Sequence, residues 1–364
     1  MKKPYFYLAA LAIGVTVVAA FNAPVSTKVL TAAGVQSMSA ITFSPEGTLF
    51  IGDSKSASVF AVPMVREKKQ NAVATFAIKN IDQKIAGALG TNVANITITD
   101  MAVHPVSKQL YIAVQHSDGT PVLLKLNGDQ LTNVSLKDMP ATTVQLNNAP
   151  APDAKDNRGR SLRISAVSDI GYSDGKLLVS GLSNHEFSSS FKSIPYPFTN
   201  KQDETTLEIY HAAHGRYETT APIKTFTTAT INNKAYLVAS YTCTPLVLFP
   251  LDELKPGLHV KGRTVAEMGS GNTPIDMLTL GNGNDAYLLM ANTKHPVAKV
   301  DYKSIAAFEG TLAEPVKGTA GVNFTATPTT NVLQMDKLTD RQVVMIQKQA
   351  NGDIDLLTSD ATTL

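Results

Sequence analysis

The stretch ITFSPEGTLFIGD, residues 41–53, shows the pattern on which the whole chain is built. A short apolar run leads into a turn at 44–47 (SPEG), and a second, very apolar run follows at 49–51 (LFI). Proline and glycine in a short turn between two apolar runs are typical of a β-hairpin. The stretch therefore predicts two paired strands.

The same unit recurs along the chain, and its second strand is the clearest marker. That strand returns at intervals of roughly 50 to 70 residues, which indicates an internal repeat. It reads LFI at 49–51, LYI at 110–112, LLV at 177–179, YLV at 236–238, YLL at 287–289 and VVM at 343–345. Short strands at regular spacing are typical of four-stranded blades arranged radially. We therefore predict an all-β fold, a β-propeller of six blades, with seven blades as the alternative if a long insert contains one more.

The last unit lacks a strand. It shows apolar runs near 331–335, 342–347 and 354–358, and the sequence then stops. The segment 26–32, ahead of the first unit, has the composition of a strand but no partner nearby. Pairing this N-terminal strand with the last blade would close the ring and remove an open sheet edge.

The first twenty residues have the order of a secretory signal. Lys2 and Lys3 precede an uncharged run at 8–20, which ends on the small residues at 18–20 (VAA). That run is shorter than the roughly 20 apolar residues of a comfortable membrane span. We expect a signal peptide at 1–20 and a single propeller domain at 21–364. The mature protein is expected to be soluble, periplasmic or secreted, without membrane association.

Charge and cysteine content narrow the classes of partner. The 32 basic residues include Lys2 and Lys3, so their removal leaves a balance with the 30 acidic residues. A nucleic-acid partner is not expected, because phosphate contacts demand a basic excess. Cys243 is the single cysteine, so no internal disulfide is possible and an apolar core must hold the fold.

The strand-and-turn rhythm resembles the broad six-bladed group that includes NHL-repeat proteins and gluconolactonase-like hydrolases. The resemblance covers residues 21–364 as a rhythm alone, without a diagnostic motif. It implies the propeller fold. Gluconolactonase-like propellers hold a metal at the central channel, but their Glu and Asn ligand pattern is not matched here.

Aligning the units on their turns selects one position near the start of each inner strand, where a side chain would face the central channel. Ala40 holds this position in the first unit, and the others are Asp100, Asp169, Lys224, Asp276 and Asn331. Carboxylates this close repel one another unless they are offset. Lys224 could offset them by pairing with Asp169 or Asp276, in a structural charge network. Alternatively, calcium or another divalent cation could bind among Asp100, Asp169, Asp276 and Asn331, because such ions prefer oxygen ligands.

Three stretches are longer than a blade requires, at 80–95, 147–160 and 183–204, and the first contains an expected helix at 81–89. All three are interpreted as connections into strand A or between strands B and C, which emerge on one face of a propeller. Long loops on a rigid scaffold are common binding surfaces, although packing over blade edges is the alternative. The expected rim contacts are Arg158, Arg160, His185, Phe187, Phe191, Tyr196, Cys243 and His295.

His211 and His214 flank two alanines in the sequence HAAH. A helix would place them one turn apart, but the flanking residues predict a strand end and a hairpin. We expect this hairpin at a C–D turn, on the face opposite the B–C loops.

The sequence contains no nucleophile elbow, phosphate loop or dinucleotide fingerprint. The leading hypothesis is an exported binding or scaffold propeller, for an unknown protein or small molecule, with its site on the strand-A and B–C-loop face. The alternative is a metal-dependent, lactonase-like hydrolase that uses the carboxylate ring. Whether the chain is an enzyme is left open, and no cofactor is certain.

Overall fold

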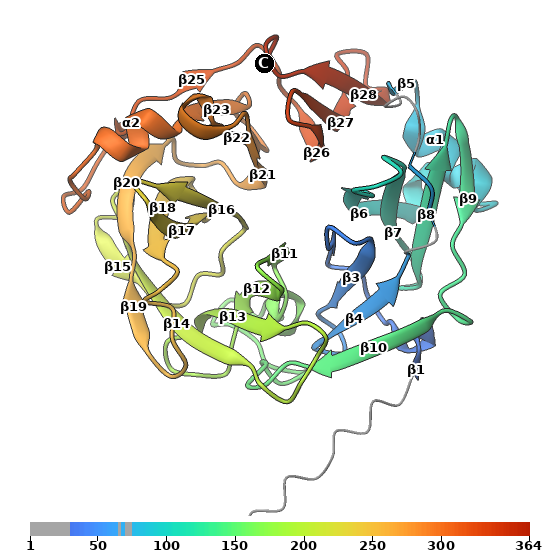
Figure 1. Ribbon diagram of the computed structural model, residues 1–364, viewed down its shortest axis with the longest axis horizontal. Coiled ribbons are helices and arrows are strands. Elements are labelled where there is room, and N and C mark those ends of the chain that lie inside the picture. Colours follow the sequence, from blue (N-terminus) through green and yellow to red (C-terminus); the bar gives the residue numbers. More distant parts are fainter. Residues whose placement is uncertain (1–29, 65–66, 70–74) are drawn as a thin grey trace, which may run out of the picture.

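The computed structural model describes residues 30–64, 67–69 and 75–364. These residues form six β-sheets arranged around a central channel (Figure 1). The six-bladed propeller predicted from the repeat is thus confirmed, and every apolar marker lies in the second strand of a blade. The expected signal peptide at 1–20 lies outside the described residues.

The first three blades each contain a strand A nearest the channel and strands B, C and D outside it. Blade 1 consists of β2 (Ala40–Phe43), β3 (Thr48–Asp53), β4 (Ser58–Pro63) and β10 (Pro140–Gln145), with β1 (Leu30–Thr31) at its outer edge. Blade 2 consists of β6 (Ile96–Val103), β7 (Leu110–His116), β8 (Pro121–Asn127) and β9 (Gln130–Asn133). Blade 3 consists of β11 (Asp169–Ser173), β12 (Lys176–Leu182), β13 (Ser189–Pro195) and β14 (Asp203–His211), with β15 (Arg216–Glu218) and β19 (His259–Lys261) paired to β14.

The other three blades repeat this arrangement. Blade 4 consists of β16 (Thr225–Ile231), β17 (Lys234–Ser240), β18 (Pro245–Pro250) and β20 (Arg263–Met268), with β24 (Thr319–Gly321) outside them. Blade 5 consists of β21 (Pro274–Leu280), β22 (Tyr287–Asn292), β23 (Ala298–Asp301) and β25 (Thr325–Ala326). Blade 6 consists of β26 (Val332–Thr339), β27 (Gln342–Lys348), β28 (Ile354–Asp360) and β5 (Ala77–Ile78).

The blades do not follow one another around the ring in chain order. Strand β6 of blade 2 lies between β26 of blade 6 and β2 of blade 1, and β2 in turn neighbours β11 of blade 3 (Figure 1). The order around the ring is therefore 6, 2, 1, 3, 4, 5. Blade 1 takes its outer strand, β10, from the chain after blade 2.

The ring is closed by a strand from the N-terminal part of the chain, as predicted, but the expected segment was wrong. Strand β5 pairs antiparallel with β28 and supplies the fourth strand of the last blade. The described end of segment 26–32 instead pairs with β10, as Leu30 opposite Ala141. The backbone N–H of Asn80 also donates to Asp355 Oδ1 at 3.0 Å, which fixes the end of β5 to blade 6.

Six clusters of buried apolar side chains hold the described ring together, one at each junction between neighbouring blades. The B strands contribute to two clusters at once. Leu49 and Ile51 face blade 2, whereas Phe50 between them faces blade 3. Because both faces of each B strand are buried, these strands are continuous apolar runs, which is why they mark the repeat so clearly.

Two short α-helices lie outside the sheets in the described part of the chain. Helix α1 (Ile81–Ala88) confirms the helix expected at 81–89 and buries Ile81 and Ile85, one turn apart, against blades 2 and 6. Helix α2 (Tyr302–Ala307) follows β23 and packs beside blades 4 and 5. The described part of the chain contains no helix that is long and apolar enough to cross a membrane.

The closure by β5 makes Ile78 a sensitive position. Ile78 is 8% exposed and packs in the same cluster as Leu356. We expect Ile78→Ala to lower the free energy of unfolding by about 2–4 kcal/mol, since it leaves a cavity at the closing strand. The exposed neighbour Lys79 provides the control, Lys79→Ala. Equal stability of the two variants in urea unfolding would contradict closure by β5.

Candidate functional site

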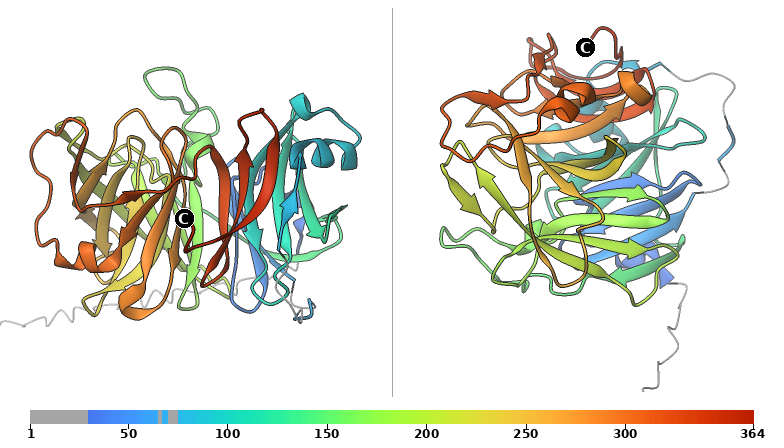
Figure 2. Two further views of the ribbon diagram at one scale, coloured as in Figure 1. Left: turned by 90° about the horizontal axis from the view of Figure 1, so that it is seen from above. Right: turned by 60° about the vertical axis from the view of Figure 1, so that its left-hand side comes forward.

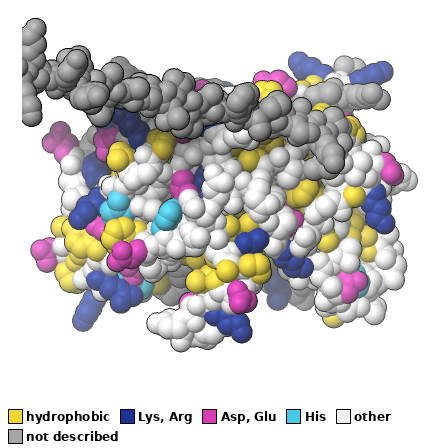
Figure 3. All heavy atoms as spheres, turned by 90° about the horizontal axis from the view of Figure 1, so that it is seen from below, with side chains coloured by type: hydrophobic (Ala, Val, Ile, Leu, Met, Phe, Trp, Pro, Cys, Tyr) yellow, Lys and Arg dark blue, Asp and Glu magenta, His cyan; other side chains and the backbone are white. Residues whose placement is uncertain are grey.

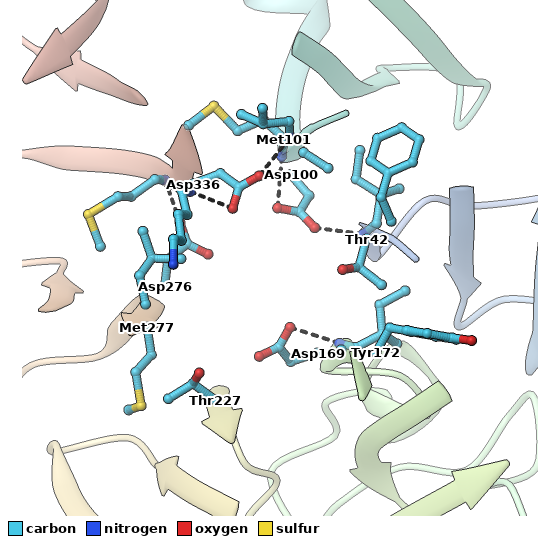
Figure 4. A pocket seen from close by; sticks show the side chains of 18 of the residues that line it. Thr42, Asp100, Met101, Asp169, Tyr172, Thr227, Asp276, Met277 and Asp336 are labelled. Atoms are coloured by element: carbon cyan, nitrogen blue, oxygen red, sulfur yellow. Dashed lines mark hydrogen bonds between the residues drawn. The ribbon is translucent and has the colours of Figure 1, made fainter. Parts of the chain in front are cut away.

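The central channel contains a cavity of about 570 Å³. Residues from the inner strand of every blade line it, and it extends to the A–B turns at Pro105, Lys108 and Asp340. Four carboxylates project into it from blades 2, 3, 5 and 6 (Figure 4): Asp100, Asp169, Asp276 and Asp336. The cavity thus runs from these carboxylates toward the A–B turns, on the face opposite the B–C loops.

Each of the four carboxylates connects its own blade to the next one around the ring. In every case Oδ2 accepts a hydrogen bond from a backbone N–H of the neighbouring inner strand. The pairs are Asp336 with Val103 at 2.6 Å, Asp100 with Ile41 at 2.6 Å, Asp169 with Phe226 at 2.9 Å and Asp276 with Met335 at 2.6 Å. All four bonds run in the same direction around the ring.

The other two junctions use hydroxyl groups. Between blades 1 and 3, Ser54 Oγ donates to the carbonyl of Val167 at 2.9 Å and accepts from its N–H at 3.1 Å. Between blades 4 and 5, the hydroxyls of Thr227 and Thr279 lie 3.2 Å apart. Polar contacts therefore bridge all six junctions, and the carboxylates serve four of them as interblade acceptors.

Burial makes these carboxylates hard to ionise. Desolvation raises the pKa of Asp169 to about 7 and that of Asp336 to about 6, against the opposing effect of their backbone hydrogen bonds. Desolvation also raises the pKa of Asp100 and of Asp276 well above the ordinary range, and repulsion from neighbouring aspartates adds to it. The ring thus holds protons at pH values where an exposed aspartate would have lost them.

The structure brings Asp100, Asp169 and Asp276 together as expected, but it does not bring Lys224 or Asn331 to them. Thr225 and Phe226, the next residues along from Lys224, line the cavity instead. Lys224 makes no ion pair within 4.0 Å among the described residues, and its pKa is lowered by burial and by the nearby Arg160. The expected charge network through Lys224 is therefore corrected to a network of hydrogen bonds.

Asp336 is the ring residue that the sequence comparison missed. The apolar runs at 331–335 and 342–347 put the turn of the sixth unit between them, whereas β26 continues to Thr339 and contains Asp336. Asn331 was selected as a consequence, but it is an exposed residue with φ of 57° just before the strand.

The four aspartates are a poor match to a cation site built from free oxygen ligands. Asp100, Asp169 and Asp336 each accept a second hydrogen bond, at Oδ1, from the backbone N–H of the following residue. Seven of the eight carboxylate oxygens are thus already acceptors, and Asn331 is not among them. The contacts fit an interblade connection better than the coordination of calcium.

The expected rim residues separate into two groups. Phe191 is 2% exposed and packs edge to face on Phe226. Tyr196 packs on Phe50, with ring centroids 4.9 Å apart. Phe191 is thus a core residue of β13, and Tyr196 is half-buried in the β13–β14 turn and packs against the core, because the stretch 183–204 contains β13 and the start of β14. The structure therefore places neither residue in a B–C loop, and burial of Phe191 does not fit a rim contact.

His185 and Phe187 do lie at a surface groove, which has a volume of about 550 Å³. The groove runs along the outer edge of blade 3, from the β12–β13 turn to the segment before β19. It is lined by Asn147, Asn148, His185, Glu186, Phe187, Gln202, Glu204, Thr206, Pro256, Gly257, Leu258 and His259. On the side of the ring that carries blade 3, hydrophobic, acidic and histidine side chains lie next to one another (Figure 3).

The other expected rim residues are spread over the B–C face and do not line this groove. Arg158 and Arg160 belong to the long loop between β10 and β11, which projects from the ring (Figure 2). Arg160 Nε donates to Asp156 Oδ2 at 2.7 Å within that loop. Cys243 lies in the β17–β18 turn, and His295 is exposed in the β22–β23 turn.

Comparison with known proteins adds no family. No protein-family profile matches the sequence, and no curated protein matches it either. Similar solved structures include PorZ, an essential surface component of the type-IX secretion system of Porphyromonas gingivalis, with 10% identity and a TM-score of 0.38 over 92% of this chain. This chain spans 38% of the length of PorZ.

Two further structures are similar over most of their own length. The β-propeller domain of Cps50 (Swd1) from Myceliophthora thermophila has 10% identity and a TM-score of 0.36, over 87% of this chain and 81% of that domain. The PQQ-bound aldose sugar dehydrogenase of Streptomyces coelicolor has 12% identity and a TM-score of 0.38, over 91% and 95%. At these values the likeness adds nothing on function, and the architecture rests on the chain's own sheets.

The raised pKa of Asp169 predicts how stability changes with pH. The folded carboxyl keeps its proton up to about pH 7, whereas the unfolded one releases it near 3.9, so the folded state binds more protons between these values. Raising the pH from 5 to 8 should therefore destabilise the protein. The variant Asp169→Asn mimics the protonated acid. Over this pH range we expect its free energy of unfolding to fall by roughly 2–3 kcal/mol less than that of the parent. Parallel pH profiles from urea unfolding would contradict this.

The interblade role of the carboxylates predicts the response to calcium. After chelator treatment, we expect millimolar calcium at neutral pH to leave the melting temperature unchanged, because the oxygens already accept backbone hydrogen bonds. Asp276→Asn serves as the comparison variant. Asp276 Oδ1 has the fewest contacts of the ring oxygens and is therefore the one most available to a cation. A calcium-induced rise in melting temperature that this variant abolishes would show instead that the ring binds the cation.

Proposed function

We propose that this chain is an exported binding propeller whose partner occupies the groove along blade 3. The observation that carries the proposal is a groove of about 550 Å³ with two large apolar side chains at its surface, Phe187 at 39% and Leu258 at 48% exposure. Concave surfaces with apolar walls and a few placed polar groups are the usual form of a binding site.

The carboxylate of Glu204 in the groove is neutralised by its neighbours. Glu204 forms a buried ion pair with Lys192 and accepts a hydrogen bond from Asn148 Nδ2 at 2.7 Å. His185 Nε2 lies 3.7 Å from the same carboxylate. Glu204 is compensated in this way, whereas Glu186, which is exposed at the groove, forms no ion pair among the described residues.

The wall of the groove is aromatic. The rings of Phe187 and His259 lie 4.3 Å apart at an angle of 31°, and His259 is held by Thr206 Oγ1 at 2.9 Å and by Glu208 Oε2 at 3.2 Å. The ring pair is thereby fixed in place while one side of Phe187 stays exposed. A rigid aromatic wall beside an exposed leucine suits a partner, peptide or small molecule, that inserts an apolar or aromatic group.

The groove includes the β12–β13 turn and so meets the B–C face, on which the sequence placed the binding site. The central cavity opens toward the other face, and its carboxylates connect the blades. A lactonase-like hydrolase would need those carboxylates as metal ligands, and their contacts do not favour that use. The binding propeller is therefore the function that we propose, in the periplasm or outside the cell, as the signal sequence predicts.

The experiment is site-specific photo-crosslinking on the full mature chain. A photoreactive phenylalanine analogue at Leu258 should crosslink a discrete partner from a periplasmic extract, and mass spectrometry then identifies it. With the purified partner, we expect Phe187→Ala to weaken binding by tenfold or more, since the aromatic wall is removed.

Ile164 provides the matched control, because it is 66% exposed but lies outside the groove. The same analogue at Ile164 should not give the crosslinked species, and Ile164→Ala should bind like the parent. Crosslinking at both positions alike, or unchanged binding by Phe187→Ala, would refute the groove as the binding site.

A further inference from the structure

Three side chains that commonly bind metals meet between blades 3 and 4. His211 is the last residue of β14, His214 lies in the turn before β15, and Cys243 lies in the β17–β18 turn of blade 4. One nitrogen of each histidine and the sulfur of Cys243 all lie within 4.8 Å of one another. The two imidazole rings are 3.9 Å apart.

The sequence had predicted that the histidines and the cysteine lie on opposite faces, and this was wrong. Strand β13 was interpreted as loop, so β14 was taken for the third strand of blade 3, although it is the fourth. A fourth strand ends on the face from which the B–C turns emerge. The end of β14 therefore reaches the turn that carries Cys243, and β14 packs beside β20 of blade 4 (Figure 1).

One carboxylate orients both imidazoles. Glu218 of β15 contacts His211 Nδ1 through Oε2 at 2.9 Å and His214 Nδ1 through Oε1 at 2.7 Å. With Nδ1–H donating to a carboxylate, the lone pair of each ring lies on Nε2. A carboxylate behind a histidine is the usual outer partner of a metal ligand, because it fixes the tautomer and the ring orientation.

The inner side of the cluster holds buried polar atoms without a partner among the described residues. His211 is 1% exposed, and its Nε2 makes no hydrogen bond. Glu267, at the end of β20, is fully buried, and its Oε2 is likewise unpaired. Its other oxygen accepts from the N–H of Ala213 at 3.2 Å and lies 4.0 Å from His211 Nε2. Buried polar atoms without a partner destabilise the folded state unless something binds them.

The turn that presents the thiol has an uncommon backbone. Cys243 and Thr244 are both left-handed, with φ of 68° and 55°, which is rare for a β-branched residue such as Thr244. Hydrogen bonds from Cys243 N to the carbonyl of Asn272 at 2.7 Å and from Thr244 Oγ1 to that of Gly269 at 2.8 Å hold it there. Conformations of this kind cluster at functional sites.

From these contacts we infer that His211, His214 and Cys243 bind a zinc ion, with Glu267 as the fourth donor. Two neutral imidazoles, a thiolate and a carboxylate offset the charge of Zn²⁺, as a buried site requires. Zinc–ligand distances of about 2.0–2.3 Å place tetrahedral ligand atoms roughly 3.5 Å apart, so the side chains close in by about 1 Å. His214, which is 39% exposed, provides the entry path and the freedom to move. The site is independent of the blade 3 groove.

The test uses the full mature chain, treated with a chelator, and Zn²⁺ alone as the probe. In competition with a chromophoric chelator we expect one zinc per chain. His211→Ala and Cys243→Ser should each weaken binding by about 100-fold or more. Glu218→Gln should weaken it by about 10–100-fold, as expected for an outer partner that touches no metal.

His116→Ala is the matched control, since His116 also faces a carboxylate, Asp118, at 3.2 Å but lies on blade 2. It should bind zinc like the parent. Cobalt substitution covers the case in which a variant folds poorly. The parent should show tetrahedral cobalt absorption with a thiolate charge-transfer band, and Cys243→Ser should lose that band alone. Absence of stoichiometric zinc in the parent, equal affinity in all variants, or a cobalt spectrum without the thiolate band would overturn the site.

Discussion

The ring depends on one repeated interaction, the hydrogen bond from a backbone N–H of one inner strand to an aspartate of its neighbour. The inner strand of a blade is an edge strand, so half of its polar groups face the channel without a partner in the sheet. Asp100, Asp169, Asp276 and Asp336 satisfy some of these donors and connect successive blades at the same time. The consequence is an enclosed group of carboxylates that resist ionisation. The carboxylates that connect the blades therefore also make the stability of the ring depend on pH.

The ring order shows how the chain departs from a simple succession of blades. Strand β5 closes blade 6 and leads directly into blade 2, as in an ordinary propeller whose N-terminal strand completes the last sheet. The departure is limited to β2, β3 and β4, which precede β5 in the chain but occupy the place between blades 2 and 3. Strand β10, which follows blade 2 in the chain, then completes their sheet. Two blades are therefore assembled from segments far apart in the sequence, and blade 2 lies between them.

The sequence predicted the parts of the fold that follow from local chemistry. The B strands are buried on both faces, so their apolar runs could be counted, and the turns between A and B strands contain Asp, Asn, Gly or Pro. The ring order could not be predicted, because β5 has only two residues and neither β5 nor β10 carries a sequence signal of which sheet it joins. The same limit affected the sites. Asp100, Asp169 and Asp276 were found by position, whereas Asp336 was lost through a misplaced turn, and the face of His211 through a strand interpreted as loop.

The interleaved order also constrains how the protein forms. The three inner strands of blade 1 are synthesised first, yet their outer edge stays open until β10 follows the whole of blade 2. Strand β5 has no sheet to join until β28, almost the last segment, has been made. Contacts so distant in sequence form slowly, and open strand edges invite pairing with other chains while they wait. Any chain that lacks β28 would leave β5 without a sheet to join and would uncover part of the apolar side of blade 2 that faces blade 6.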